Sequence, residues 1–368
     1  MKINRYIHGI LENYKNFKDY WNYEDGCVLS GCMQLFEVTG ERIYRDFIFR
    51  YLESLIADDG AILNFDNSKY SVDSFNSGKV LFFALSQSGE EKYRRAIEYL
   101  WTRLESYPRT SEGNFIHKSI YPDQVWLDGL YMVQPFYALY EKYFGSADYD
   151  DITKQFINVR KRMFIAEKSL YCHGYDTARV QFWADRNSGL SGSFWLRSAG
   201  WYMMALADVI DIIGDTENKC SRELAEIFKE AVNGILKYED GKTGLFYQVI
   251  DRGDDTRNYM ETSGSLMIAY SLIKGSELGM LEKDVCCKKG MRIFEYIVRE
   301  KLTEKNNQLS LTDICSSAGL GPGDERDGSP EYYVSEKIVS DDPKGIGALM
   351  MVYAHYIKCC GKMQEEEK

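Results

Sequence analysis

Hydrophobic positions along most of the chain recur at i, i+3, i+4 and i+7, the spacing of one face of an α-helix, and strand-like alternation is rare. The helical segments come in pairs, in which an apolar segment rich in small residues is followed, after a short turn, by a segment with one charged face. Residues 27–40 and 41–57 show this pattern clearly. It recurs in residues 77–89 with 90–106, 126–145 with 149–163, 198–215 with 221–240, and 261–279 with 281–302.

The two ends of the chain supply a sixth pair. The apolar segment 344–360 has no partner after it, and the amphipathic segment 3–17 has none before it. Joining these two segments closes six helical hairpins into a ring. The pattern therefore predicts an all-α fold, an (α/α)6 barrel forming a single catalytic domain over residues 1–368, with the apolar helices inside. An open helical solenoid is the alternative, although its two ends would need polar caps.

The connections that lead from an outer helix to the next inner helix are long, whereas the turns within each pair are short. Long loops inside a compact domain usually carry function. Because every long connection precedes an inner helix, we expect all of them at the same mouth of the barrel. They cover roughly residues 57–77, 106–125, 165–198, 239–262 and 301–344.

Composition narrows the classes of function. The formal net charge of −11 argues against a nucleic-acid partner, which needs a basic surface. We expect no membrane span and no secretory signal, because no stretch of about 20 apolar residues occurs and the N-terminus lacks an apolar core. Nine cysteines without a CxxC pair favour neither a metal site nor a disulfide framework. The expectation is a cytoplasmic protein without a cofactor, as a monomer or homodimer.

Two acidic residues stand where inner helices begin. Asp128 follows Trp126 in the stretch YPDQVWLDGLYM, and Asp73 lies in YSVDSFNSGKV. Either carboxylate could simply cap its helix. If the two lie close together, however, the pKa of one of them rises, and the apolar wall of Trp126 acts in the same direction through desolvation. A carboxylic acid that stays protonated near neutral pH in this way can act as a proton donor.

Histidines and tryptophans gather in the same long connections. His117 and His173 lie in two of them, and Trp195 and Arg197 open the fourth inner helix in GSFWLRSAGWY. An aromatic surface beside polar groups suits a sugar ring, which has an apolar face and a hydroxyl edge. Arg197 is interpreted either as a stacked structural residue or as a bidentate ligand of a carboxylate.

Four stretches of the sequence resemble the unsaturated rhamnogalacturonyl hydrolases, glycoside hydrolase family 105, which are related to the unsaturated glucuronyl hydrolases. The resemblance spans nearly the whole chain. It implies an (α/α)6 barrel and a hydrolase that acts on a small anionic oligosaccharide, a lyase product that ends in a 4,5-unsaturated galacturonic acid. The stretches are PRTSEGNFIHKSIYPDQVWLDGLYM, HGYDTARVQFWADRNSGLSGSFWLRSAGWYMMALAD, METSGSLMIAYSL and EYYVSEKIVSDDPKGIG.

The resemblance also implies roles for individual residues. Asp128 matches the proton donor of the family and Asp73 its second acid. The residues that match its sugar contacts are His117, Trp126, His173, Trp195 and Arg197. Three positions depart from the family pattern: Ile116 replaces a Trp, Leu196 replaces a Gly, and Asp341 replaces an Asn. We expect the first two of these departures to touch the pocket.

The substrate chemistry suggests a hydration. An unsaturated uronate is an enol ether, so protonation at C4 creates a cationic centre at C5 that water can trap. Three alternatives stay open: a hydrolase of other unsaturated uronyl disaccharides, an epimerase that uses His117 and His173 as acid and base, and a non-catalytic carbohydrate-binding protein. The acidic net charge would repel an anionic substrate, and we expect cations near the mouth to offset it. These are Lys79, Lys118, Arg179 and Arg197.

Overall fold

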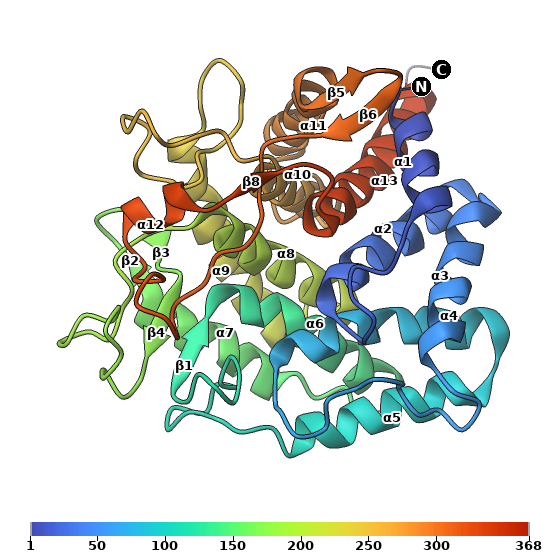
Figure 1. Ribbon diagram of the computed structural model, residues 1–368, viewed down its shortest axis with the longest axis horizontal. Helices are drawn as coiled ribbons and strands as arrows, with labels where there is room; N and C mark the ends of the chain where they lie inside the picture. The colour runs from blue at the N-terminus through green and yellow to red at the C-terminus, as the bar shows by residue number, and fades with distance from the viewer. Residues whose placement is uncertain (1, 367–368) are drawn as a thin grey trace.

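Helical hairpins form a closed ring in the computed structural model, which describes residues 2–366 and the side chains of residues 2–361 (Figure 1). The inner helices are α2 (Tyr23–Thr39), α4 (Lys79–Ser88), α6 (Leu127–Tyr143), α8 (Leu196–Ile213), α10 (Thr262–Glu277) and α13 (Pro343–Glu366). The outer helices are α1 (Lys2–Asn13), α3 (Arg42–Leu55), α5 (Glu91–Glu105), α7 (Asp150–Met163), α9 (Lys219–Ile235) and α11 (Lys288–Tyr296). Shorter helical turns are η1 (Val72–Gly78), η2 (Leu236–Tyr238), η3 (Lys283–Cys287), η4 (Ile297–Lys301) and α12 (Pro330–Ser335).

Contacts between neighbouring inner helices run all the way round the ring. α2 packs against α13, α13 against α10, α10 against α8, α8 against α6, and α6 against η1 and α4, which return to α2. The N-terminal helix α1 completes the outer ring, because the Tyr353 hydroxyl of α13 donates to Asn4 at 2.6 Å and Arg50 of α3 donates to the Leu11 carbonyl at 2.9 Å. The predicted (α/α)6 barrel is confirmed, and the open solenoid is excluded.

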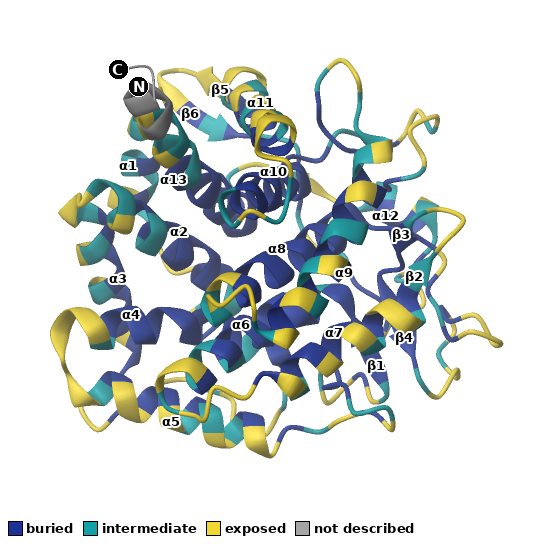
Figure 2. Ribbon diagram, turned by 180° about the vertical axis from the view of Figure 1, so that it is seen from behind, coloured by how far each residue is buried: buried dark blue, intermediate teal, exposed yellow. Residues whose placement is uncertain are grey.

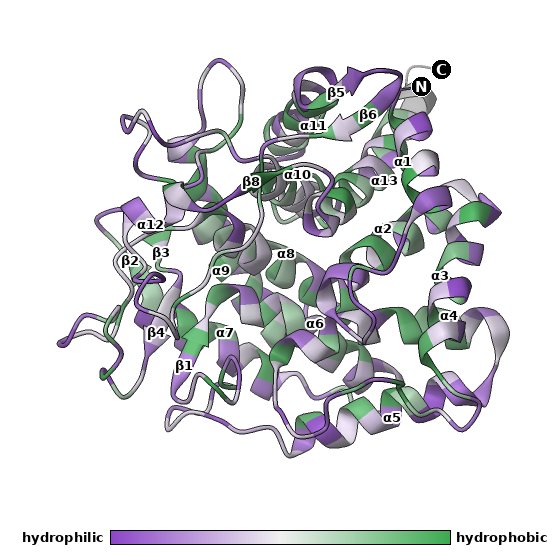
Figure 3. Ribbon diagram, in the orientation of Figure 1, coloured by the Kyte–Doolittle hydropathy of each residue, from purple (hydrophilic) through white to green (hydrophobic). Residues whose placement is uncertain are grey.

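The hydrophobic pattern explains which helices lie inside. In α8, every residue from Leu196 to Ile210 is buried. The outer helix α9 instead buries a single stripe that includes Leu224, Ile227, Phe228 and Ala231, spaced i, i+3, i+4 and i+7. Figure 2 shows inner helices buried almost throughout and outer helices with exposed outward faces, and Figure 3 shows the same division in hydropathy.

Two glycines allow α2 and α13 to approach closely and close the ring. A Cβ atom at Gly31 would lie 2.6 Å from the Cβ of Met350, and one at Gly347 would lie 2.4 Å from the Cys27 carbonyl oxygen. Both distances are far below van der Waals contact, so any larger residue would push the two helices apart. The first and last inner helices therefore pack backbone to backbone.

The strands are short ribbons within the long connections from outer to inner helices. β1 (Gln124–Trp126) pairs with β4 (Gly174–Asp176), β2 (Phe164–Ile165) with β3 (Leu170–Tyr171), β5 (Leu302–Lys305) with β6 (Gln308–Leu311), and β7 (Ile314–Cys315) with β8 (Ile338–Val339), all antiparallel. The ribbons hold these connections over the barrel mouth. None of the described helices is long and apolar enough to cross a membrane.

Candidate active site

The β1–β4 ribbon brings two of the predicted site residues together. Its register pairs Trp126 with Gly174, and the backbone N–H of Leu127 donates to the His173 carbonyl at 3.0 Å. Asp128 comes two residues after Trp126, and His173 comes directly before Gly174, so the two residues lie side by side at the end of the ribbon. The ribbon therefore fixes the imidazole next to the carboxylate at the start of α6.

Asp128, His173 and Tyr333 form a continuous chain of hydrogen bonds. The Nε2 atom of His173 lies 3.2 Å from Oδ1 of Asp128, and its Nδ1 atom lies 2.6 Å from the Tyr333 hydroxyl. Burial raises the pKa of the Tyr333 phenol well above its ordinary value, so Tyr333 keeps its proton and can donate it to Nδ1. We assign the imidazole hydrogen to Nε2, which then donates to Asp128.

This hydrogen bond reverses the ionisation that the sequence predicts for Asp128. Burial alone raises the pKa of its carboxyl group. The hydrogen bond from His173, the electrostatic interaction with the His117 and His173 rings and its own backbone N–H outweigh burial and lower the pKa to about 2. The prediction that Asp128 is protonated near neutrality is therefore wrong for the substrate-free protein, in which the carboxylate is ionised.

Asp73 has a cationic partner rather than a second carboxylate. The Lys118 ammonium lies 2.5 Å from Oδ2 of Asp73. Burial lowers the pKa of Lys118, but the charge and hydrogen bond of Asp73 and the charge of Asp128 raise it above its ordinary value. Asp73 is therefore paired with an ammonium and not with Asp128, although the charges of both acids act on Lys118.

Aromatic rings make a wall beside Asp128. His117 stacks on Trp126 with 4.1 Å between ring centroids, Trp126 lies 5.4 Å from His173, and His173 lies 4.8 Å from Trp195. Burial lowers the pKa of His117 to about 4, so this imidazole is neutral at pH 7. Gly129 leaves room for it, since a Cβ atom there would lie 3.0 Å from Nδ1 of His117. The predicted aromatic residues thus form one surface.

Arg197 lies beneath this wall and is almost completely buried. Its guanidinium donates to the Cys315 carbonyl, to Ser263 Oγ at 3.4 Å and to the Ser316 carbonyl at 3.4 Å, and it lies 4.9 Å from the Trp195 ring. Of the two interpretations, this geometry matches the structural one. The bidentate contact with a substrate carboxylate stays a prediction.

The predicted cations divide between two ends of the barrel. Lys118 and Arg197 lie at the mouth, and Arg179 is exposed on the loop after β4. Lys79 was expected at the mouth, but η1 adds two helical turns before it, so Lys79 points into the barrel. Its ammonium lies 3.8 Å from the centroid of the Tyr131 ring and lines a cavity of about 390 Å³ near the opposite end. The expectation for Lys79 is therefore wrong.

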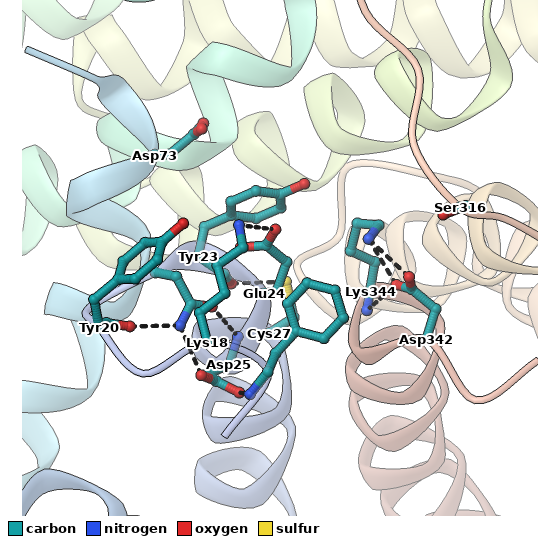
Figure 4. Close-up of polar contacts among 12 residues, drawn as sticks. Lys18, Tyr20, Tyr23, Glu24, Asp25, Cys27, Asp73, Ser316, Asp342 and Lys344 are labelled. Carbon is teal, nitrogen blue, oxygen red and sulfur yellow. Dashed lines mark hydrogen bonds and ion pairs between the residues drawn. The ribbon is translucent and has the colours of Figure 1, made fainter. Parts of the chain in front are cut away.

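Tyr23 was not predicted, because the sequence pattern places the start of the first inner helix at residue 27 and α2 begins four residues earlier. Figure 4 shows the Tyr23 ring between Asp73 on one side and the Lys344–Asp342 ion pair on the other. Burial and the charges of Glu24 and Asp73 raise its pKa. Its hydroxyl has no hydrogen-bond partner among the described residues, so it is available to a ligand.

A cavity of about 790 Å³ lies beside Asp73. Its size falls within the range of small-molecule sites. Three lysines, four carboxylates and four aromatic residues contribute to its lining, a combination that offers charged groups and flat apolar surfaces to a molecule with rings. They are Lys18, Lys69, Lys118, Asp19, Glu24, Asp66, Asp73, Tyr20, Trp21, Tyr23 and Phe65.

The three departures from the family pattern have structural explanations. Ile116 and Leu196 are buried in the main hydrophobic core, and Leu196 packs against Gly264 of α10. Asp341 has φ of 55°, a left-handed conformation that Asn and Asp tolerate better than most residues. Its carboxylate accepts hydrogen bonds from the Tyr6 hydroxyl at 2.7 Å and the Leu311 backbone at 2.8 Å. Asp341 thus attaches the last long connection to α1.

Within the described residues, no three His, Cys, Asp or Glu side chains are grouped so that they could hold a metal ion.

Comparisons with known proteins match this chain to a glycoside hydrolase family. The model of Glycosyl Hydrolase Family 88 matches residues 2–360. A family 105 glycoside hydrolase of C. acetobutylicum is 38% identical with a TM-score of 0.92, covering 97% of this chain and 99% of that chain. Unsaturated rhamnogalacturonyl hydrolase YesR of Bacillus subtilis is 23% identical over 265 residues, 70% of this chain and 72% of that protein. An unsaturated glucuronyl hydrolase of a Bacillus species, 14% identical, shares the fold with a TM-score of 0.63, covering 96% of this chain and 95% of that chain.

Replacing Arg197 with Lys tests its structural role. A lysine ammonium cannot reach Ser263 and both carbonyls together, so we expect the free energy of unfolding to fall by about 2–3 kcal/mol. Thermal unfolding measures this loss, and Arg179→Lys on the exposed loop is the matched control. An unchanged melting temperature combined with a large increase in KM would instead make Arg197 a substrate ligand.

Proposed function

The chain belongs to Glycosyl Hydrolase Family 88 and is a glycoside hydrolase, and on this premise we propose that it removes a 4,5-unsaturated galacturonic acid from short pectin or rhamnogalacturonan fragments left by lyases. The observation that carries the proposal is the Asp128 carboxylate, which is held by His173 beside an aromatic wall, with His173 held in turn by Tyr333. The name of the YesR relative supports the substrate class. Such fragments reach the protein in the cytoplasm.

The proposed reaction hydrates the double bond. Asp128 delivers a proton to C4, which creates an oxocarbenium-like centre at C5. Water adds at C5 and returns a proton to the Asp128 carboxylate. The resulting hemiketal opens to a ketone at C5, and the hemiacetal left at C1 then releases the neighbouring sugar. Asp73 holds Lys118 in place beside the substrate.

Protonation of Asp128 is coupled to substrate binding. The free carboxylate is ionised, because its pKa is about 2. A substrate carboxylate bound near it adds a second negative charge and excludes water, and both effects raise the pKa of Asp128. Substrate therefore binds together with a proton, and the acid form exists mainly in the complex.

An anionic ligand in the cavity beside Asp73 would depend on the three lysines there, because four carboxylates line the same cavity. Lys18 is paired with the buried Glu24 at 2.6 Å, whereas Lys69 reaches only the exposed Asp66 at 3.0 Å. Surface pairs of this second kind are weak, so Lys69 can turn toward a ligand. Aromatic side chains in the same cavity offer the apolar surface that a sugar ring needs.

The structure weakens the epimerase alternative. An epimerase needs an acid and a base on opposite faces of a sugar ring. His117 is buried against Trp126, and both nitrogens of His173 are committed to Asp128 and Tyr333. The non-catalytic alternative does not fit a member of a glycoside hydrolase family. Other unsaturated uronyl disaccharides remain as the second candidate substrates, and a panel of lyase-generated disaccharides separates the two.

Asp128→Asn tests the proton donor. An amide cannot deliver a proton to C4, so we expect kcat to fall by about 10²–10⁴-fold while the melting temperature stays close to that of the parent. The loss of ultraviolet absorbance from the conjugated double bond measures turnover. The matched control is Asp46→Asn on the exposed face of α3. Turnover close to normal would reduce Asp128 to a residue that supports the helix N-terminus.

The pH dependence follows from the pKa of Asp128. Because the acid form is required and the free-enzyme pKa is about 2, the protonated fraction falls about tenfold for each pH unit above it. We expect kcat/KM, which reports the free enzyme, to fall with rising pH between pH 5 and 8 more steeply than kcat. Parallel profiles for the two parameters would mean that the proton does not arrive with the substrate.

Labelled water distinguishes hydration from ordinary glycoside hydrolysis. Hydration places the water oxygen at C5 of the released sugar acid, whereas hydrolysis with two carboxylates flanking the glycosidic bond places it at C1. We expect mass spectrometry of the product, formed in ¹⁸O-enriched water and trapped at once by reduction, to locate the label at C5. Label at C1 would sink the hydration mechanism.

A further inference from the structure

Two cysteines that are far apart in the sequence meet at the end of the barrel opposite the site. Cys287 ends η3, Cys359 lies near the end of α13, and their sulfur atoms are 3.5 Å apart. No hydrogen bond joins any other two cysteines in the described part of the chain. A disulfide requires the sulfur atoms to come about 1.5 Å closer, which small side-chain rotations can supply.

We propose that Cys287 and Cys359 are a redox-sensitive pair that forms a reversible disulfide by exchange with a small-molecule disulfide such as glutathione disulfide. The pair is not fully enclosed. Cys287 is 9% exposed, and Cys359 is partly exposed. A small oxidant can therefore approach from the Cys359 side, and no unfolding of the barrel is needed.

The two thiols have different roles in the exchange. The hydrogen bond from Cys359 lowers the pKa of Cys287 to about 7, whereas that same contact, burial and the nearby Glu277 carboxylate raise the pKa of Cys359. Cys287 is thus the thiolate that attacks one sulfur of glutathione disulfide and expels a glutathione thiolate. Cys359 then loses its proton, attacks the Cys287 sulfur and expels the second glutathione thiolate. One glutathione disulfide becomes two glutathione molecules, and the protein loses two hydrogen atoms.

A disulfide between Cys287 and Cys359 would link two helices of the closed ring. The cross-link joins the start of the outer helix α11 to α13, the helix that closes the ring against α2. The covalent loop between Cys287 and Cys359 contains the long connection that supplies Tyr333 to His173 and the Cys315 and Ser316 carbonyls to Arg197. Because a cross-link restricts the unfolded chain, it stabilises the closed ring.

The test oxidises the full-length reduced protein with glutathione disulfide and maps its peptides without reduction. We expect a linked peptide that contains Cys287 and Cys359, and a melting temperature about 5 °C higher than in the reduced protein. The chain offers matched controls at the neighbouring positions. Cys286→Ser and Cys360→Ser should keep both effects, whereas Cys287→Ser and Cys359→Ser should remove them.

The wild-type peptide map keeps the proposal falsifiable even if a serine variant folds poorly. A persistent mixed disulfide with glutathione at Cys287, without the cross-link, would overturn the proposal. So would a linked peptide that contains Cys286 or Cys360 in place of Cys287 or Cys359. The outcome is independent of the substrate, because neither the oxidation nor the melting temperature depends on turnover.

Discussion

Closure of the ring is the constraint on which the site depends, because it makes the inner helices begin at a single mouth. Each helix start carries a partial positive charge from its unpaired backbone N–H groups. Acids from four inner segments meet these charges there: Asp73 in η1, Asp128 in α6, Glu261 as the cap of α10, and Asp342 before α13. The converging helix starts favour ionised carboxylates and an anionic ligand, although the chain as a whole is acidic.

The last long connection, roughly residues 301–344, contributes the remaining contacts of the site. It crosses the mouth and places the Tyr333 hydroxyl on His173 and the Cys315 carbonyl on Arg197. The hydrogen-bond chain to Asp128 is therefore built from three segments that are distant in sequence. The three residues act together: the β1–β4 ribbon positions the imidazole of His173, and the phenol of Tyr333 then determines which imidazole nitrogen carries the hydrogen.

The sequence was sufficient to predict the barrel, its closure and the gathering of acids, histidines and tryptophans at one end, because helical periodicity reports directly which helices are buried. The sequence could not identify which side chain each of these groups contacts. Nothing local indicates that His173 rather than Asp73 is the partner of Asp128, or that Lys118 pairs with Asp73, since these contacts join different connections. The direction of the pKa shift of Asp128 was predicted wrongly because its partner, His173, was not identified. Lys79 was misplaced because η1 extends its helix by two turns toward the mouth.

Under the proposed function, the ionised state of Asp128 makes the charge of the substrate part of the chemistry. With a pKa of about 2, this carboxylate holds a proton at pH 7 only at a large cost in free energy. A neutral sugar could offset only the part of this cost that comes from excluding water. A uronate bound beside Asp128 also supplies a like charge, which makes the acid form favourable when the double bond is in place. Binding of the substrate carboxylate is therefore what allows Asp128 to hold the proton that it delivers. A neutral analogue fails as a substrate even where it fits the cavity.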